Sequence, residues 1–306
     1  MSLFIGVDGG GTRTRAVVMN VDGKELARTE GPSSLINPTN LQDTIDVITQ
    51  VCREAIYEVG AMFPANVLWA GIAGAGNDSL RSMVQNGLQD AGIAKAVHVG
   101  TDADAAFHDA FGSGPGILLI SGTGSASLGR GVDGSAVNVG GWGALLGDEG
   151  SGYAVGMMAL RAVVQGEDGR SMKTQLCAPI LEKLAVDRIE DLITWVAIAS
   201  KSDIASLAPI VCAQAEAGDE VAGTIIENAA NHLVDHVLTV AKRLSPWPDR
   251  PMVAFTGGLI DADGPLRQKV LTSIQSLSFE VCDLVVDAAR GASQLAIVSV
   301  ETGFDN

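Results

Sequence analysis

The sequence predicts an α/β protein built from two similar domains. Two observations lead to this prediction: predicted strands alternate with helices through the first half, and a strand, a glycine-rich turn and a second strand follow one another twice, at residues 3–19 and 117–129. Such alternation is typical of parallel strands that are covered by helices and bind ligands at their carboxyl ends. The length of 306 residues fits about two domains of roughly 150 residues each.

The first glycine-rich turn is the sequence Asp-Gly-Gly-Gly-Thr at residues 8–12, between apolar strands over 3–5 and 16–19. Glycine tolerates φ > 0 and leaves its N–H groups open to a ligand, so the turn predicts a phosphate-binding loop. Thr12 adds a hydroxyl donor, and Asp8 could hold a hydrated Mg²⁺. An ordinary tight turn is the alternative for any one such loop, but three further glycine clusters downstream argue against it.

The rest of the first domain continues the alternation. The segment 40–60 has apolar residues at helical spacing, whereas the loop 31–38 contains two prolines and two serines that interrupt regular structure and could contact a ligand. The remaining predicted elements are a strand near residues 26–28, a strand over 67–73, a helix over 78–91, a strand over 96–100 and a helix over 105–111.

Two aspartates stand where a predicted strand passes into a helix, in the sequence Thr-Asp-Ala-Asp at residues 101–104. This position places Asp102 at the carboxyl end of a strand, where it can reach a bound substrate. Capping of the helix N-terminus is the alternative role for an Asp here. With Asp104 also available, one aspartate can cap while the other acts on a ligand. The glycine cluster at 112–116 then predicts a hinge between domains.

The second half opens as the first does, with a strand over 117–120, a Ser-Gly-Thr-Gly-Ser turn at 121–125 and a strand over 126–129. We therefore expect a second phosphate-binding turn. Residues 129–134 also match the spacing G-x-G-x-x-G, but a predicted strand over 135–139 follows where a dinucleotide-binding motif requires a helix.

The loop over 140–152 is the richest in glycine and contains Trp142, Asp148 and Glu149. An aromatic ring and carboxylate acceptors suit a sugar ligand. A core position for Trp142 and acidic capping of the next helix by the two carboxylates are the alternatives.

The chain from 152 to 244 is mostly helical in pattern. His232 and His236 lie four apart on one predicted helix, a spacing that could bind a metal, but no third ligand accompanies them. The predicted elements that complete the chain are helices over 174–184, 204–217 and 220–244, a strand over 252–255 followed by a Thr-Gly-Gly turn at 256–258, a helix from Pro265, a strand over 279–284 and a helix over 291–300.

The charge and the cysteines exclude several classes of protein. A net charge of −16 argues against nucleic acid or an acidic membrane as a partner. Because the start has no basic region and no apolar run approaches the ~20 residues of a membrane span, we expect a cytoplasmic protein. The four cysteines are widely separated, which favours neither a zinc site nor a disulfide framework.

Taken in order, these motifs make the chain resemble the N-acetylglucosamine kinase branch of the BadF/BadG/BcrA/BcrD ATPase family. That family belongs to the superfamily of sugar kinases, the heat-shock protein seventy ATPase domain and actin. The resemblance covers essentially the whole chain. It rests on residues 8–12, 101–103, 121–125, 141–151 and 256–258.

The resemblance implies two ribonuclease-H-like domains that face a cleft for nucleotide and sugar. They would span residues 1–112 and 113–306, the second with a helical insertion and with its last helix packed back on the first. The nucleotide would be ATP with Mg²⁺, the metal held through water by Asp8. The implied nucleotide contacts are Gly10, Gly11, Thr12 and Arg13 in the first phosphate loop, Gly122, Thr123, Gly124 and Ser125 in the second, and Thr256, Gly257 and Gly258 beside the adenosine.

The resemblance also implies that Asp102 is the catalytic base. The other implied sugar contacts are Asn37, Thr123, Gly141, Trp142 and Asp148. The expected function is an ATP-dependent amino-sugar kinase, a homodimer, that phosphorylates the 6-hydroxyl of N-acetylglucosamine. A glucosamine kinase, an ATPase activator of CoA-ester reductases or dehydratases, and a non-catalytic sugar sensor are the alternatives. The activators hold an iron–sulfur cluster through cysteines, and none of the four cysteines here has suggestive neighbours.

Overall fold

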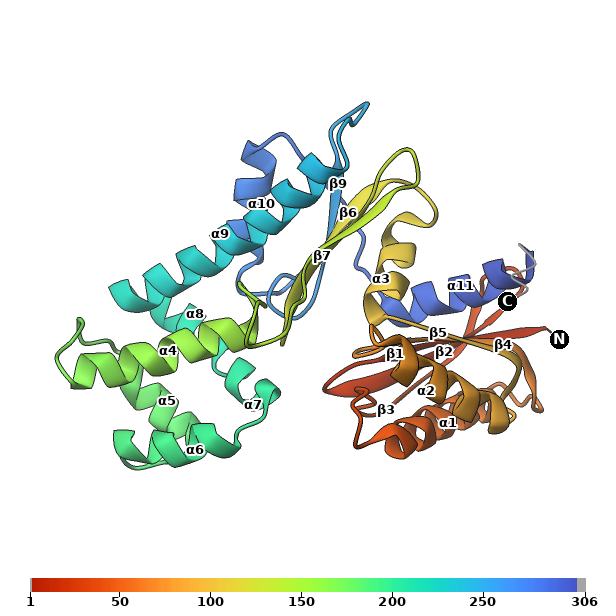
Figure 1. The fold of residues 1–306 in the computed structure, drawn as a ribbon, viewed down its shortest axis with the longest axis horizontal. Helices are drawn as coiled ribbons and strands as arrows, with labels where there is room; N and C mark the ends of the chain where they lie inside the picture. Colours follow the sequence, from red (N-terminus) through yellow and green to blue (C-terminus); the bar gives the residue numbers. More distant parts are fainter. Residues whose placement is uncertain (1, 302–306) are drawn as a thin grey trace. The chain divides into compact units, whose positions relative to one another are not determined.

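The structure is a computed structural model that describes residues 2–301. The chain divides into two compact units (Figure 1). Unit 1 comprises the residues up to Ser113 together with those from Val286 onward, and unit 2 comprises Gly114–Val285. The chain therefore leaves unit 1 once and returns to it near its end.

Unit 1 is built on a five-stranded sheet in the order β3-β2-β1-β4-β5. β1, β2 and β3 are antiparallel neighbours, whereas β4 and β5 run parallel to β1. The carboxyl ends of the three parallel strands consequently lie at one edge of the sheet. The strands span Leu3–Gly9 (β1), Arg13–Asn20 (β2), Glu25–Pro32 (β3), Ala65–Ile72 (β4) and Ala94–Gly100 (β5).

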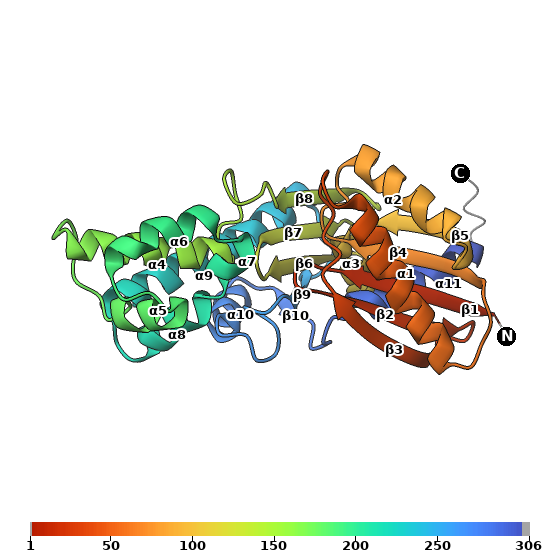
Figure 2. The ribbon, with the colours of Figure 1, turned by 90° about the horizontal axis from the view of Figure 1, so that it is seen from below.

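Helices cover both faces of this sheet (Figures 1 and 2). α1 (Leu41–Glu58) and α2 (Asp78–Asp90) pack on one face, and α3 (Asp102–Phe111) and α11 (Ala288–Glu301) pack on the other. β1 supplies both cores because its side chains alternate between the faces: Ile5 belongs to the core under α1 and α2, and Phe4 belongs to the core under α11. The uninterrupted apolar run over residues 3–5 therefore reflects burial on two sides.

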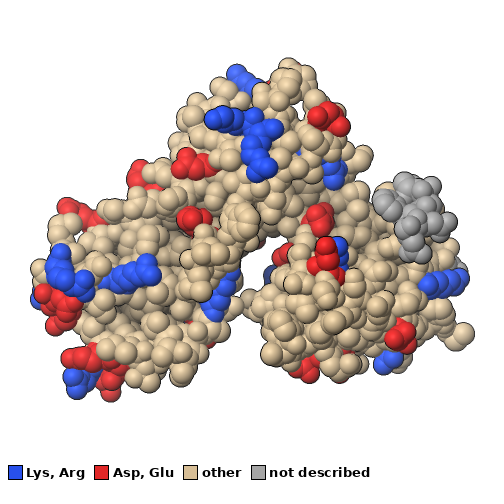
Figure 3. Space-filling view, in the orientation of Figure 1, with Lys and Arg blue, Asp and Glu red and all other residues tan. Residues whose placement is uncertain are grey.

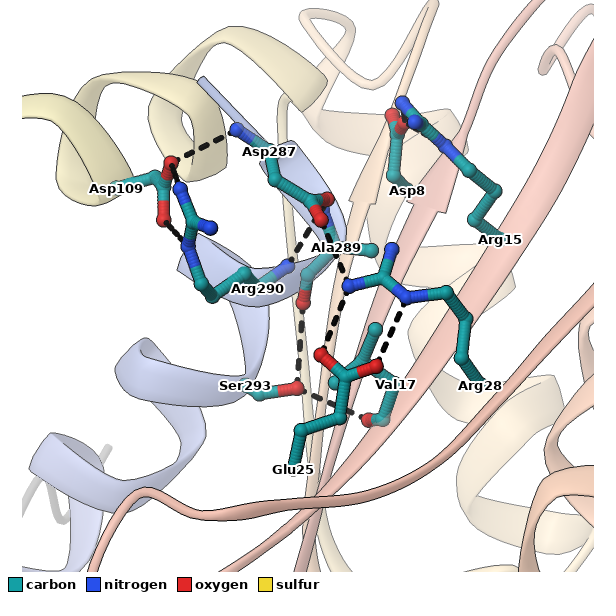
Figure 4. A network of polar contacts seen from close by, with 10 residues as sticks. All are labelled: Asp8, Arg15, Val17, Glu25, Arg28, Asp109, Asp287, Ala289, Arg290 and Ser293. Carbon is teal, nitrogen blue, oxygen red and sulfur yellow. Dashed lines mark hydrogen bonds and ion pairs between the residues drawn. The ribbon is translucent and has the colours of Figure 1, made fainter. Parts of the chain in front are cut away.

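A polar network fastens α11 to unit 1 where the chain returns to it (Figure 4). The buried carboxylate of Asp109, near the end of α3, accepts two bonds from the Arg290 guanidinium at 2.6 and 2.7 Å and one from the Asp287 N–H at 2.8 Å. Arg28 on β3 pairs with Asp287 at 2.7 Å and with Glu25 at 2.9 Å. These ion pairs hold the pKa of Asp287 below its ordinary value against the opposing effect of burial. The network thus ties β3, α3 and α11 together.

Unit 2 repeats the same plan with a sheet in the order β10-β9-β6-β7-β8. β6, β7 and β8 are antiparallel neighbours, β9 runs parallel to β6, and β10 runs parallel to β9. The carboxyl ends of β6 and β9 therefore meet at one edge. The strands span Gly116–Ser121 (β6), Ser125–Arg130 (β7), Ala136–Gly140 (β8), Met252–Thr256 (β9) and Glu280–Val281 (β10).

The helices of unit 2 share one large apolar core with its sheet. α9, the longest, contacts β6, β7 and β8, and α4 packs on α7, α8 and α9. These helices are α4 (Gly152–Glu167), α5 (Cys177–Leu184), α6 (Leu192–Ile198), α7 (Lys201–Ala205), α8 (Ala208–Glu216), α9 (Glu220–Arg243) and α10 (Arg267–Ser276), with a 3₁₀ turn at Ile189–Asp191.

The predicted fold class, α/β with two ribonuclease-H-like halves, is confirmed by the two sheets of identical plan. Two predicted elements were wrong in extent. The helix expected over 204–217 is interrupted at residues 206–207 and starts again as α8, which has a proline in its first turn, a position that proline favours. The strand expected over 279–284 is reduced to β10, which has two residues.

The distribution of charged side chains on the surface agrees with the excess of acidic residues in the sequence. On the face drawn in Figure 3, Lys and Arg side chains lie in small separate groups among acidic and uncharged residues. Among residues 2–301, no helix has the length and apolar character needed to cross a bilayer.

Candidate active site

In unit 1, the carboxyl edge of the sheet brings the first glycine-rich turn beside the loop that carries Asn37. The N–H of Ala73, just after β4, donates to the carbonyl of Gly9 at 2.7 Å, and the N–H of Ile36 donates to the carbonyl of Ala73 at 2.9 Å. Ser33 Oγ donates to the carbonyl of Gly10 at 3.0 Å. The buried side chain of Ile36 anchors this loop in the core. Loops distant in sequence therefore form one local surface.

The first turn has an exposed tip. Gly11, Thr12 and Arg13 are exposed, and a Cβ atom on Gly11 would meet nothing within 4 Å. Glycine tolerates positive φ, but Gly9, Gly10 and Gly11 are not among the residues that adopt it. The turn is closed by the Gly10 N–H, which donates to the Arg13 carbonyl at 2.9 Å. The glycines of this turn leave its backbone accessible to a ligand, and none of them is needed for a left-handed conformation.

Asp8 lies at the end of β1 with its side chain only 14% exposed, paired with Arg15 on β2 at 2.6 Å. Arg15 contacts the same carboxylate oxygen through its Nε at 3.2 Å. This guanidinium fixes the orientation of the carboxylate at the mouth of the sheet.

Asp102 is released from the capping role that an Asp at this position often has. Thr101 is the N-cap of α3, and its Oγ accepts from the Asp104 N–H at 3.1 Å. The Asp104 carboxylate accepts in return from the N–H and Oγ of Thr101 at 3.1 and 2.7 Å. Asp104 therefore performs the structural task. Burial first, and then the negative charge of Asp8, raise the pKa of Asp102 to about 6, close to the range that suits a general base.

Asn37 has a clear local role. Its side-chain oxygen accepts from the N–H and Oγ of Thr39 at 2.9 and 2.7 Å, and its N–H donates to Asn40 Oδ1 at 2.9 Å. The side chain thereby shapes the loop before α1.

In unit 2, the second turn at 121–125 is enclosed by the loop that precedes α4. Ser121 Oγ donates to the Gly150 carbonyl at 2.8 Å, and Ser125 Oγ donates to the Glu149 carbonyl at 2.7 Å. The Gly152 N–H, at the start of α4, donates to the Gly122 carbonyl at 2.8 Å. Both serines of the turn are therefore buried structural residues, and the middle of the turn is more open.

The Thr-Gly-Gly turn after β9 packs directly on the second turn. Gly257 has a φ of +106°, and a Cβ atom there would lie 2.6 Å from the carbonyl carbon of Ser121 and 3.0 Å from the Gly122 nitrogen. The Leu259 N–H donates to the Ser121 carbonyl at 3.0 Å. The two turns thus form one continuous backbone surface at the ends of β6 and β9, with Thr256 and Gly258 on either side of the contact.

Trp142 is 75% exposed, so the core position considered for it was wrong. Its loop is held by the Gly141 N–H, which donates to the Ser125 carbonyl at 3.0 Å. Gly140, Gly141 and Gly143 all have positive φ, a backbone that a residue with a side chain would adopt only with strain. The indole is presented outward next to the second turn.

Asp148 is buried, and its carboxylate is held by two groups. Lys201 Nζ donates to Oδ2 at 2.6 Å, and the Ser125 N–H donates to Oδ1 at 3.4 Å. Asp148 also has a φ of +61°, which is uncommon for a residue other than glycine. Capping of α4 is performed by Ser151, whose Oγ accepts from the Ala154 N–H at 3.1 Å.

Lys201 is a residue that the sequence reasoning missed. A signal for it was present, because Ser200 and Asp203 form a capping box that marks the start of a helix at Lys201. Lys201 lies 53 residues after Asp148 in the chain, and nothing in the sequence indicated that the two side chains meet in the fold.

The histidine pair on α9 is not part of a metal centre in this structure. His236 is buried against Gly140, and burial lowers its pKa. Among the described residues, no group of three or more His, Cys, Asp or Glu side chains could hold a metal ion.

Comparison with known proteins shows the family to which the chain belongs. The model of the BadF/BadG/BcrA/BcrD ATPase family matches residues 5–296. An N-acetyl-D-glucosamine kinase of Dictyostelium discoideum is 32% identical over 317 residues, which cover 97% of this chain and 98% of that protein. An N-acetylmuramic acid/N-acetylglucosamine kinase of Clostridium acetobutylicum is 32% identical over 265 residues, which cover 85% of this chain and 86% of that protein.

Among solved structures, one from Chromobacterium violaceum, described as a candidate N-acetylglucosamine kinase, superposes with a TM-score of 0.80. It is 27% identical to this chain, and the match covers 97% of this chain and 99% of that one. Because the family model spans nearly the whole chain and the relatives match along their full length, this protein belongs to the BadF/BadG/BcrA/BcrD ATPase family.

Proposed function

We propose that this protein is an ATP-dependent amino-sugar kinase that phosphorylates the 6-hydroxyl of N-acetylglucosamine. The observation that carries the proposal is the state of Asp102. This carboxylate lies at the end of β5, is free of the capping role that Asp104 performs, and has a pKa raised to about 6. The names of the two relatives that are 32% identical point to the same class of reaction.

In the proposed reaction, Asp102 accepts the proton of the sugar hydroxyl while that hydroxyl attacks the γ-phosphorus of ATP. A bond forms between the hydroxyl oxygen and phosphorus, the bond from phosphorus to ADP breaks, and the proton ends on Asp102. Phosphoryl transfer of this kind depends mainly on positioning and on stabilising charge. The carboxylate must be ionised to act, so its raised pKa sets the lower pH limit of activity.

The phosphates would be bound by backbone N–H groups and hydroxyls of the two glycine-rich turns. In the first turn, the proposed contacts are Gly10 and the exposed residues Gly11, Thr12 and Arg13. In the second, the proposed contacts are Gly122, Thr123, Gly124 and Ser125, with Thr256, Gly257 and Gly258 beside the adenosine. Such contacts suit a strongly acidic protein because they need no basic surface.

The residues of unit 1 fit a hydrated Mg²⁺. Mg²⁺ usually binds through one or two carboxylates and keeps several waters, and Asp8 and Asp102 are close enough that, after burial, the charge of Asp8 contributes most to the raised pKa of Asp102. A cation would relieve this repulsion. When bound, Mg²⁺ would neutralise phosphate charge, and Asp8 would hold it through water.

The sugar would be bound by Asn37, Thr123, Gly141, Trp142 and Asp148 in addition to Asp102. The exposed indole of Trp142 offers a flat apolar wall of the kind that binds sugar rings. Each oxygen of the Asp148 carboxylate already has a partner, Lys201 at Oδ2 and the Ser125 N–H at Oδ1, so a contact with the sugar would share one of these oxygens. A cytoplasmic location and a homodimer stay predictions from the sequence.

An assay of ADP release over N-acetylglucosamine, glucosamine, N-acetylmannosamine and glucose tests the proposal. We expect the highest kcat/KM with N-acetylglucosamine, and the D102N variant, purified in the same way, controls for contaminating kinases. A preference for glucosamine would identify a glucosamine kinase instead. ADP release that no sugar stimulates would favour an ATPase activator, although Cys52 and Cys212 are buried and so are poorly placed to hold a cluster.

A further inference from the structure

Lys201 is held rigidly beside the second glycine-rich turn. It is the first residue of α7, whose N-terminus is fixed by the capping box of Ser200 and Asp203. α7 packs tightly on α4: a Cβ atom on Gly152 would lie 3.1 Å from Cβ of Ala205, and one on Gly156 would collide with the backbone of Ile204. Because the Gly152 N–H at the start of α4 donates to the Gly122 carbonyl at 2.8 Å, this packing fixes Lys201 relative to residues 121–125.

The ammonium group of Lys201 lies next to Gly124 in the middle of the turn. A Cβ atom on Gly124 would lie 3.0 Å from Lys201 Nζ and 3.2 Å from Asp148 Oδ1. Any side chain at this position would therefore crowd the ion pair. The same closeness means that an anion bound on the Gly124 side of the turn would be within reach of the ammonium.

The ion pair is asymmetric in its exposure. The Asp148 side chain is 4% exposed, whereas the Lys201 side chain is 39% exposed. An ammonium group has three N–H donors, and the contact with Asp148 Oδ2 at 2.6 Å uses one of them. The buried carboxylate thus orients a lysine that keeps donors for a second, solvent-side acceptor.

We propose that Lys201 binds a phosphate group of the nucleotide at the turn 122–125, with Asp148 as its positioning residue. This inference rests on the proposed function, which makes that turn a phosphate site. Backbone N–H groups and hydroxyls supply only partial charges, whereas lysine supplies a full charge to phosphate. Asp148 therefore acts on the nucleotide through Lys201, in addition to any contact with the sugar.

The test compares the binding of Mg-ADP and of adenosine by calorimetry. In K201M we expect the Kd for Mg-ADP to rise about tenfold, which corresponds to about 1.4 kcal/mol, while adenosine binding stays unchanged because adenosine lacks phosphate. K201R should retain most of the affinity because it keeps the charge. The matched control is K183M, which removes an exposed lysine of the same unit and should bind both ligands as the wild type does.

A simpler role for Lys201 would be to neutralise the buried charge of Asp148. To separate the two roles, D148N is compared with K201M/D148N, since neither protein contains an unpaired buried carboxylate that could unfold it. Our proposal expects the double variant to bind Mg-ADP more weakly than D148N, by a smaller factor than K201M shows, because D148N lacks the carboxylate that positions Lys201. Equal affinities in this pair would overturn it.

Outcomes for the wild-type protein separate this inference from the proposed function. Failure of the wild type to bind Mg-ADP would overturn both. Normal binding of Mg-ADP by the wild type and equally by K201M would overturn the role of Lys201 and leave the kinase proposal standing.

Discussion

Asp102 derives its chemistry from the side chains around it. Asp104 and Thr101 satisfy the start of α3, which leaves the Asp102 carboxylate available, and burial together with Asp8 raises its pKa to about 6. A carboxyl whose pKa is raised on folding stabilises the folded state below its unfolded pKa, and this contribution is lost as pH rises to about 6. The protein therefore gives up some stability to hold this group ionised at neutral pH.

The consequence for activity can be measured with D102N. This variant keeps the shape of the side chain but removes the proton acceptor, so kcat should fall by about 10²- to 10⁴-fold while sugar affinity changes little. In the wild type, kcat/KM should be half-maximal at a pH of about 6 and level off at higher pH, because only ionised Asp102 accepts a proton. Steady-state kinetics from pH 5 to 8 with direct sugar-binding measurements would check both expectations.

D104A is the control for this prediction. It removes the capping partner of Thr101 and should lower stability by about 1 kcal/mol while leaving the proton acceptor in place. Near-normal turnover in D102N would show that another group is the base, and Asp148 would be examined next.

Single residues also mark the limit of prediction from sequence. The position of Asp102 could be predicted because it follows a local rule, the place just after a parallel strand. Lys201 could not be found, because its importance depends on α7 packing on α4, a contact between elements far apart in the chain. Trp142 was ambiguous for a related reason, since exposure is a property of the folded loop.

At the scale of elements, Gly257 joins two turns that we propose bind the nucleotide. In G257A, the new methyl group would press on Ser121 and Gly122, in addition to the strain of a φ of +106°. We expect the Kd of the variant for Mg-ADP, measured by calorimetry, to rise about tenfold or more while the variant remains folded at low temperature.

Gly218 provides the matched control. It has a φ of +94° but open space around its missing side chain, so G218A carries the backbone strain without the crowding. If G218A and G257A bound Mg-ADP equally well, the contact between the two turns would not be important for the nucleotide.

The elements themselves were largely predictable because their patterns are local. Apolar periodicity located the long helices α1 and α9, and alternation of strands and helices identified the parallel strands. The break between α7 and α8 was missed because apolar residues continue through it. The length of β10 was overestimated because only two residues of the apolar segment pair with β9.

At the scale of the whole molecule, the return of the chain to unit 1 depends on the pair formed by Asp109 and Arg290. The Asp109 side chain is fully buried, and removal of one partner from a buried ion pair typically costs about 3–5 kcal/mol. R290M should therefore shift the first unfolding transition in urea to a clearly lower urea concentration, whereas a variant that breaks an ion pair at the surface should not.

The control for this prediction is R188M, which breaks the exposed pair of Arg188 and Glu190. Exposed pairs contribute little, so its urea midpoint should match that of the wild type. Equal midpoints for R290M and R188M would mean that α11 is held by its apolar contacts alone.

The division of the molecule was only partly visible in the sequence. The repeated turn indicated two similar halves, but the place where the second half ends carries no glycine-rich signal. Asp287 and Arg290 are ordinary charged residues in the sequence, and their connection to Asp109, 178 and 181 residues earlier, exists only in the folded chain.

The contact between β1 and α11 has a consequence for the synthesis of the protein on the ribosome. Phe4, Val17 and Met19 are almost completely buried, in cores that Ala289 and Ala296 of α11 complete. The strands that carry them emerge well before the helix that covers them. At roughly 5–20 residues per second, this apolar face stays uncovered for about 15–60 s in every nascent chain. Chaperones would meet unit 1 in this open state, and a prematurely terminated chain would never leave it.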